Sequence, residues 1–285
     1  MDYAHPEALV STAWLATHLG DKTLRVADAS FTLPGVTPTG HALYLQRHIP
    51  GAVFFDIDAV ADERNPLPHM LPDEKTFGAM MGKLGLGDGH KIVVYDSTGL
   101  ASAPRAWWSL KAYGHKNVAI LNGGLPKWLS ENRPVTTEIP SYPAASFTAR
   151  LFKAGLRDKA QMLANLETRR EQVIDARSAG RFAGTAPEPR AGLRSGHIPG
   201  SLSLPSDQLS DPKTKEVLPA DALAARFRAA GLDPHKPVVS SCGSGVTACV
   251  LAFGLHLLGW NEAAIYDGSW SEWGLPGSTP VETGS

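Results

Sequence analysis

The residues best suited to chemistry lie in one short loop, Cys-Gly-Ser-Gly-Val-Thr-Ala, from Cys242 to Ala248. The loop follows a short apolar run typical of a strand, Pro237 to Ser241, and leads into an apolar stretch of helical length, Val246 to Leu258. Backbone N–H groups converge at such a strand-to-helix turn, and their dipoles favour the thiolate over the thiol. Because the thiolate is the nucleophilic form of cysteine, the pattern predicts that Cys242 carries out covalent chemistry.

The alternative for Cys242 is a buried structural role, since unpaired cysteines are often buried. The small polar residues around it are poor core material, which favours the nucleophile. Cys249 gives the contrast, because it lies inside the apolar stretch and is predicted to pack in the core. Only two cysteines, both in one loop-helix unit, do not indicate a disulfide framework and favour a reducing compartment.

Size and composition indicate a globular protein with two cores. The chain has 285 residues, of which 43% are hydrophobic and 19% charged, and a net charge of -1. Nothing in that balance argues for a nucleic acid or a membrane surface as partner. The first residues do not resemble a signal peptide, and no apolar run approaches the length of a spanning helix. We therefore expect a soluble, cytoplasmic protein.

The chain carries the same series of landmarks twice, in the same order, which shared composition would rarely produce. Each series has an apolar strand ending in aspartate, a His-Ile-Pro-Gly segment, a helix-length run after Leu-Pro, a second apolar strand, and a glycine turn before Trp. The paired segments are 25–30 and 173–177, 48–52 and 197–201, 71–86 and 218–232, 92–95 and 238–240, and 123–128 and 268–273. We predict domains at 8–134 and 159–281, joined by a linker at 135–158 whose first part is rich in proline.

Short apolar runs alternate with longer amphipathic ones in both halves, which predicts an α/β fold of two tandem domains, each a parallel sheet flanked by helices on both faces. The loops that follow the strands then lie along one edge, and the Cys242 loop is one of them. A gapless comparison pairs Cys242 with Ser97, so the first half is predicted to lack the nucleophile. The other repeated side chains are predicted to be structural: His48, His197, Asp28, Asp175, Trp128 and Trp273.

Together, the two His-Ile-Pro-Gly halves and a Cys-Gly-Ser-Gly-Val-Thr-Ala loop in the second half alone resemble the tandem-domain rhodanese-type sulfurtransferases. The form of the loop is similar to that of the 3-mercaptopyruvate sulfurtransferases. The resemblance implies that Cys242 takes sulfur from the donor, holds it as a persulfide, and passes it to a small thiol, a thioredoxin-like protein or cyanide. It implies no metal and no organic cofactor. Gly243, Gly245, Val246 and Thr247 would form the binding loop around the sulfur.

Donor choice depends on cations near the loop. Gly243 and Ser244 offer none for a compact dianion such as thiosulfate, whereas an arginine fork suits the carboxylate of a 2-oxo acid. Arg181 and Arg190 lie in the segment GRFAGTAPEPR, which resembles the family's substrate-binding stretch. The resemblance implies that both bind the carboxylate and carbonyl of 3-mercaptopyruvate. Without it, they would be ordinary solvated arginines, as we expect for Arg194.

A proton relay is implied by the same resemblance at Asp58, His69 and Ser244. Histidine suits such a role because it titrates near neutral pH. The relay would be assembled from both halves, with Cys242 outside it. The alternatives are a capping or solvated Asp58, a loop histidine at His69, and a Ser244 that donates a hydrogen bond without a catalytic role.

Competing functions fit less well. A cysteine-dependent phosphatase needs an arginine at the far end of the loop, where this chain has Ala248. A zinc site is disfavoured by the spacing of Cys242 and Cys249. A thiosulfate-preferring sulfurtransferase and a non-catalytic sulfur-carrier or interaction module remain as alternatives, the second because the first half keeps its fold pattern without a cysteine.

Overall fold

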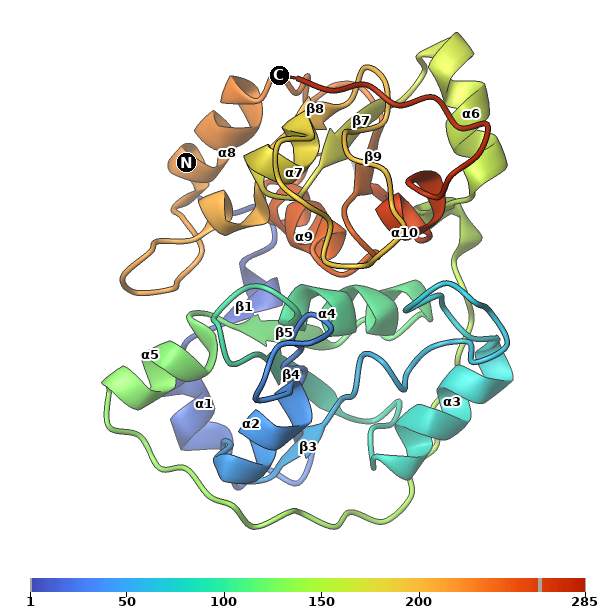
Figure 1. Ribbon diagram of the computed structural model, residues 1–285. Helices are drawn as coiled ribbons and strands as arrows, with labels where there is room; N and C mark the ends of the chain where they lie inside the picture. The colour runs from blue at the N-terminus through green and yellow to red at the C-terminus, as the bar shows by residue number, and fades with distance from the viewer. Residues whose placement is uncertain (1, 261–262, 285) are drawn as a thin grey trace.

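The computed structural model describes residues 2–260 and 263–284 and contains two parallel sheets of five strands each (Figure 1). The first sheet has the order β1-β5-β4-β2-β3 and the second β6-β10-β9-β7-β8. The first-sheet strands are β1 (Leu9–Val10), β2 (Leu24–Asp28), β3 (Ala52–Phe54), β4 (Lys91–Tyr95) and β5 (Val118–Leu121). The second-sheet strands are β6 (Leu156–Arg157), β7 (Gln172–Asp175), β8 (Leu202–Ser203), β9 (Val238–Ser241) and β10 (Ala264–Tyr266). The repeat seen in the sequence is therefore a repeat of the whole sheet topology.

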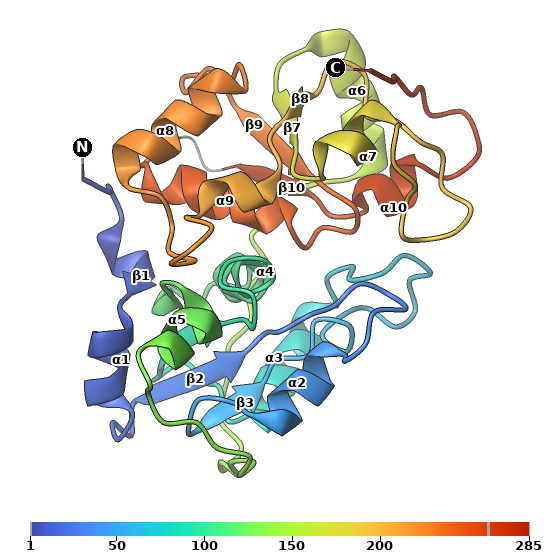
Figure 2. The same ribbon diagram turned by 60° about the vertical axis from the view of Figure 1, so that its left-hand side comes forward.

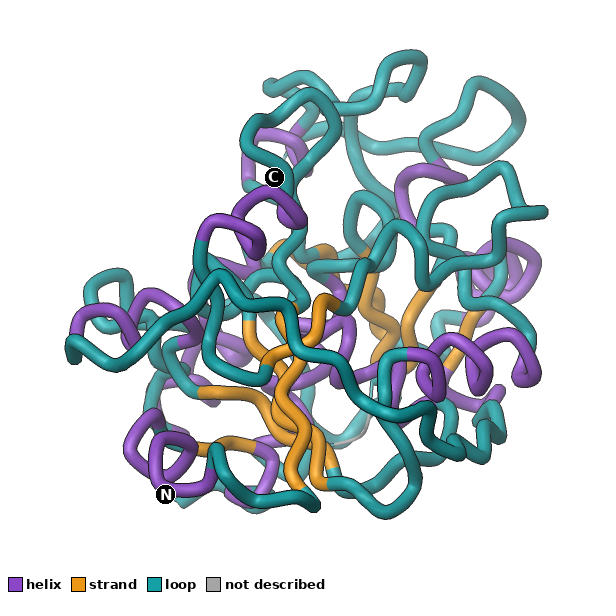
Figure 3. The backbone as a smooth tube through the Cα atoms, turned by 90° about the horizontal axis from the view of Figure 1, so that it is seen from below, coloured by secondary structure: helices purple, strands orange, loops and turns teal. Residues whose placement is uncertain are grey.

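Helices cover both faces of each sheet, as predicted (Figure 3). The central strands β4 and β9 are therefore buried on both sides. The first domain has α1 (Thr12–His18), α2 (Gly40–Gln46), α3 (Glu74–Lys83), α4 (Ala103–Ala112) and α5 (Gly124–Ser130). The second has α6 (Lys159–Thr168), α7 (Ala179–Ala183), α8 (Ala220–Ala229), α9 (Ala248–Leu257) and α10 (Ser269–Trp273). Short 3-10 turns lie at Pro6–Ala8, Lys153–Gly155 and Ser206–Leu209. Side-chain caps begin several of the helices, among them Ser11, Thr39, Asp73 and Asp158.

The two domains pack through α4 and α9, which lie between the two sheets (Figures 1 and 2). Trp107 of α4 meets Phe253 of α9 edge to face, with ring centroids 4.9 Å apart. Buried residues of both domains form one continuous apolar cluster across this contact. Because α9 begins directly after the Cys242 loop, the contact fixes that loop against the first domain.

The strand pairing corrects one sequence prediction, the match of Cys242 with Ser97. Asp28 pairs with Tyr95 in the first sheet, and Asp175 pairs with Ser241 in the second. Tyr95 and Ser241 are therefore equivalent, and the residue that corresponds to Cys242 is Asp96. The gapless comparison failed because the loops differ in length: residues 96–102 join β4 to α4, whereas residues 242–247 join β9 to α9.

The segment between α5 and β6 is extended but bound along the first domain. Thr136 pairs with His48 through both backbone N–H groups, Tyr142 donates its hydroxyl to the Gly51 carbonyl, and the Phe147 ring packs on Phe77. His197 forms the same kind of bridge with Glu282 near the other end of the chain. The repeated histidines thus hold the segment that follows each domain's last helix, which is the structural role predicted for them.

Repeated aspartates and tryptophans also serve structure. Asp28 accepts the Ser30 N–H, and Asp175 forms an ion pair with Arg177. The Trp128 and Trp273 indoles are buried, and their N–H groups donate to carbonyls of the following segments. Within residues 2–260 and 263–284, no helix has the length and apolar character needed to cross a membrane.

Candidate active site

The Cys242 loop lies at the carboxyl edge of β9 and is held by the turn after β10. Cys242 and Gly243 accept N–H groups of Trp270 and Ser271 through their carbonyls, at 2.9 and 2.8 Å. Ser271 also donates its hydroxyl to the Gly243 carbonyl, at 2.7 Å. Gly245 has φ of 76°, a left-handed conformation that glycine adopts without strain. Cys242 is 1% exposed, so the residue predicted to be the nucleophile is largely shielded from bulk water.

The loop of the first domain shows what this turn binds. The Asp96 carboxylate accepts five backbone N–H groups at 2.7 to 2.9 Å, those of Thr98, Gly99, Ala101, Ser102 and Ala103. In the second domain, the N–H groups from Gly243 to Ala248 donate to no protein acceptor in the described part of the chain. The first loop is thus filled by its own anion, and the second presents free donors around Cys242.

Three residues predicted to form a relay are brought together from the two domains. His69 is buried, and its Nε2 lies 2.8 Å from Asp58 Oδ1. Its Nδ1 lies 3.1 Å from Ser244 Oγ and 3.1 Å from the Ser244 carbonyl. His69 has φ of 63°, which is uncommon outside glycine and asparagine, so the surrounding contacts must hold it there. The arrangement links an exposed carboxylate to a hydroxyl two residues from Cys242.

Arg105 of α4 joins the two halves of the site, and the sequence prediction missed it. Its guanidinium is buried and donates to the carbonyls of His69 and Gly245 and to Asp267 Oδ1, the last at 2.8 Å. Asp267 in turn accepts the Leu71 N–H at 2.9 Å. This one side chain therefore positions both the relay histidine and the Cys242 loop. Its partner lies 162 residues away, and no local pattern signals such a pair.

Arg181 lies directly against the Cys242 loop. A Cβ placed on Gly243 would lie 2.9 Å from Arg181 Nη2, so the arginine occupies the space that a side chain at Gly243 would need. Glu188 holds Arg181 through Nη2 at 2.5 Å and also accepts from Arg177 Nη1 at 2.8 Å. Glu188 stands between the two predicted arginines in GRFAGTAPEPR, a sequence signal that the prediction did not use. Arg181 Nη1 makes no hydrogen bond within the described residues.

Arg190 is half-buried and makes no hydrogen bond with any described residue. Burial lowers the pKa of its guanidinium, and the neighbouring charge of Arg181 acts in the same direction. Its electrostatic interactions with Asp58, Cys242 and Glu188 oppose that shift in pKa, which places Arg190 near all three. A partly buried guanidinium without a partner is costly unless an anion binds it. Arg194 differs, because it donates to the carbonyls of Trp273 and Thr279, so the prediction of an ordinary solvated arginine was wrong at this position.

The other predicted loop residues contribute through the backbone. Val246 is 4% exposed and packs in the core, so only its N–H can face a ligand. Thr247 is the N-terminal cap residue of α9 without a side-chain capping bond. Cys249 is buried in α9, as predicted, and burial raises the pKa of its thiol to about 12, which keeps it protonated and unreactive.

The comparisons with known proteins agree with this geometry. The family model for the rhodanese-like domain matches residues 11–131 and 158–275. The chain belongs to the rhodanese-type sulfurtransferases. It is 42% identical over 272 residues to the 3-mercaptopyruvate sulfurtransferase of Homo sapiens, covering 93% of this chain and 91% of that protein. It is 45% identical over 274 residues to the thiosulfate sulfurtransferase of Bos taurus, with the same coverage. The crystal structure of SseA from Escherichia coli, described as a 3-mercaptopyruvate sulfotransferase, matches with a TM-score of 0.84, 39% identity and coverage of 93% and 99%.

Overall identity does not separate the two donor classes among these rhodanese relatives, since 42% and 45% are nearly equal. The residues around Cys242 must decide the donor.

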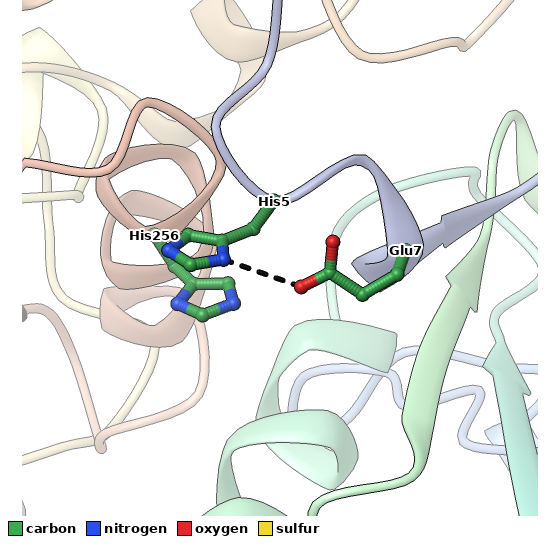
Figure 4. Close-up of side chains that lie close together, drawn as sticks. All are labelled: His5, Glu7 and His256. Atoms are coloured by element: carbon green, nitrogen blue, oxygen red, sulfur yellow. Dashed lines mark hydrogen bonds and ion pairs between the residues drawn. The ribbon is translucent and has the colours of Figure 1, made fainter.

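A histidine cluster lies outside the rhodanese site, where the N-terminal segment crosses the end of α9 (Figure 4). His5 Nδ1 lies 3.2 Å from Glu7 Oε1, and the rings of His5 and His256 stack with centroids 4.4 Å apart and planes 9° apart. These three side chains are close enough to hold a metal ion. However, the nitrogen lone pairs of two parallel rings do not converge on one point, and Lys111 Nζ lies 3.3 Å from His256 Nε2. The cluster as it stands serves to attach the N-terminal segment to the second domain.

Proposed function

We propose that this sulfurtransferase moves sulfur from 3-mercaptopyruvate through a Cys242 persulfide to a thiol or to cyanide and releases pyruvate. The supporting observation is the position of the cations. Within the described residues, Arg190 has no hydrogen-bond partner and Arg181 Nη1 donates to no acceptor beside Gly243, whereas the loop from Gly243 to Thr247 carries no cation. A planar carboxylate with an adjacent carbonyl matches two guanidinium groups outside the loop. A compact dianion such as thiosulfate instead needs a cation within the loop itself.

The first step forms one bond and breaks another. The Cys242 thiolate attacks the donor sulfur, the carbon–sulfur bond breaks, and its electron pair moves onto the enolate of pyruvate. Arg181 and Arg190 stabilise the carboxylate and the developing enolate oxygen. The free N–H groups of the loop would bind the persulfide, as the equivalent groups bind the Asp96 carboxylate in the first domain.

Proton transfer is the task proposed for Asp58, His69 and Ser244. The donor thiol loses a proton and the enolate carbon gains one, so a group that can accept and return a proton is required. Ser244 Oγ would contact the substrate, His69 would take and return the proton, and Asp58 would orient the imidazole. No redox partner is required for either step.

A comparison of donors tests this proposal. Pyruvate release from 3-mercaptopyruvate and thiocyanate formation from thiosulfate are measured with cyanide as the common acceptor. We expect kcat/KM to be at least about tenfold higher for 3-mercaptopyruvate, which corresponds to about 1.4 kcal/mol of transition-state stabilisation. A preference for thiosulfate would favour the thiosulfate-specific alternative. Absence of transfer from both donors would favour a carrier or interaction module.

A further inference from the structure

A cavity adjoins the relay residues on the side of the first domain. It lies between the loop that follows β2 and the residues after β3, and its volume is about 410 Å³. Phe31, Leu33, Val36 and Phe54 supply apolar walls. Its size and mostly apolar lining fall in the range of small-molecule sites. In Figure 2 the blue loop after β2 lies on the side of the first domain that faces α10 and the loop after α7.

The inner wall of this cavity consists of residues that contact His69. Asp58 lines the cavity and accepts from His69 Nε2 at 2.8 Å. Phe31 lines it too, and its ring meets the His69 ring edge to face with centroids 5.1 Å apart. A molecule in the cavity would therefore lie against the outer end of the relay, whereas the donor arginines belong to the second domain.

The charge of the cavity is the opposite of that of the donor site. Among the described residues that line it, Asp56 and Asp58 are the charged ones apart from the titratable His41, and none is a lysine or arginine. Arg190 of the donor site lies within electrostatic range of Asp58 but does not line the cavity. Asp56 Oδ1 accepts the N–H groups of Asp58 and Ala59, at 3.0 and 3.3 Å. The second carboxylate oxygens of Asp56 and Asp58 accept no hydrogen bond within residues 2–260 and 263–284. Two free carboxylate oxygens beside apolar walls match an ammonium group on a short carbon chain.

We propose that this cavity is the sulfur-acceptor subsite and that it selects small thiols carrying an ammonium group. The inference rests on the proposed function, since it assigns the second half of the same reaction. The acceptor thiol gives its proton to the Ser244 hydroxyl, which passes its own to His69, and the acceptor sulfur attacks the outer sulfur of the Cys242 persulfide. The sulfur–sulfur bond breaks, Cys242 leaves as the thiolate, and the acceptor leaves as a persulfide. Sulfur passes from one thiol to another with no net oxidation.

Donor and acceptor thus use different subsites of opposite charge. An anionic donor is drawn to Arg181 and Arg190, and a cationic acceptor to Asp56 and Asp58. The same separation would keep a second donor molecule from occupying the acceptor subsite while Cys242 carries sulfur.

The test separates the two half-reactions. The full-length protein is loaded with sulfur from 3-mercaptopyruvate and freed of pyruvate, and the loss of the persulfide is followed with cysteamine, 2-mercaptoethanol or 3-mercaptopropionate. These thiols carry a positive, neutral and negative group. Each thiol is compared with itself between variants, so that its intrinsic reactivity cancels.

Two variants change the charge of the subsite. Asp56→Asn keeps the oxygen that accepts the Asp58 and Ala59 N–H groups, and we expect it to lower the second-order rate constant for cysteamine about fivefold while 2-mercaptoethanol is unaffected. Val36→Lys adds a cation at a position that is 50% exposed. We expect it to slow cysteamine and to accelerate 3-mercaptopropionate. Glu63→Gln, an exposed carboxylate of the same region outside the cavity, is the matched control.

Equal effects on all three thiols, or no effect of either variant, would overturn the acceptor subsite. Failure of 3-mercaptopyruvate to load Cys242 would instead contradict the proposed donor. In that case inorganic polysulfide loads the cysteine, and the same comparison of acceptors still decides whether the cavity selects by charge.

Discussion

Asp96 in the first domain and Cys242 in the second occupy the same position, directly after equivalent strands. The Asp96 carboxylate fills its loop and accepts five backbone N–H groups. The Cys242 loop is one residue shorter and leaves its N–H groups free within the described residues. The duplicated fold therefore has the same turn twice: in the first domain it binds the Asp96 carboxylate, and in the second its N–H groups lie beside Cys242, the proposed nucleophile.

The buried Asp96 carboxylate predicts a stability effect without a catalytic one. Asp96→Asn would place an amide NH₂ against N–H donors that the carboxylate now binds. We expect the free energy of unfolding to fall by about 3 kcal/mol, the order of a charged hydrogen bond that is lost with a donor left unsatisfied. Urea denaturation measures it, with the exposed Asp21→Asn as control. An unchanged unfolding midpoint would contradict the role assigned to Asp96.

The position of Cys242 predicts complete loss of transfer in Cys242→Ser, because the serine hydroxyl is not nucleophilic here and forms no persulfide. The thermal midpoint should stay close to that of the parent, since the side chains are nearly equal in volume. Cys249→Ser is the matched control and should retain transfer. Intact-mass measurement after exposure to 3-mercaptopyruvate detects the added sulfur. A persulfide on the Cys242→Ser protein would place the nucleophile elsewhere.

The contact between Gly243 and Arg181 predicts that a single methyl group changes donor use. In Gly243→Ala the new Cβ would meet Arg181 Nη2 at 2.9 Å and push the guanidinium away, while Glu188 resists the movement. We expect kcat/KM for 3-mercaptopyruvate to fall about tenfold with little change in stability. Gly89→Ala, where an added Cβ meets nothing, is the control. Equal kinetics in the two variants would show that the contact does not set the position of Arg181.

Arg190 and Arg194 are close in sequence but should respond in opposite ways to the same substitution. Arg190→Gln removes a guanidinium without a described protein partner, so we expect a higher KM for 3-mercaptopyruvate and an unchanged thermal midpoint. Arg194→Gln removes donors to the Trp273 and Thr279 carbonyls, so we expect a lower midpoint and near-normal KM. Kinetics and thermal unfolding of both variants measure the contrast. The reverse pattern would place the anion site at Arg194.

The sequence predicted what is local or repeated. The two tandem parallel α/β halves follow from the duplicated landmarks, and the strand-to-helix turn from the residues between Cys242 and Ala248. The relay came from a resemblance, because Asp58 and His69 lie far along the chain from Ser244. The Arg105–Asp267 pair could not be predicted, since the two residues meet only when α4 of the first domain packs on the second domain, where Asp267 follows β10. The match of Cys242 with Ser97 was wrong because the loop after β9 is one residue shorter than the loop after β4. Only the strand register reveals this difference.

Acid should destabilise the first domain through two histidines with lowered pKa values. Burial lowers the pKa of His115, whose Nε2 has no hydrogen-bond partner among the described residues, and partial burial also lowers the pKa of His90. Below the ordinary histidine pKa of about 6.5, the unfolded chain binds protons that the folded chain does not. Stability contributed by these groups is therefore present above about pH 6.5 and is lost as the pH falls through their lowered folded values.

His115→Gln should reduce this loss, because a side chain that does not titrate replaces one that must stay neutral when folded. The check is the difference in urea midpoint between about pH 7.5 and about pH 5.5, which should be smaller in His115→Gln than in the parent. His235→Gln, at an exposed histidine, serves as the control and should keep the parental difference. If both variants lose stability in acid as steeply as the parent, the acid sensitivity arises from groups other than His115, and the desolvated imidazole is not its cause.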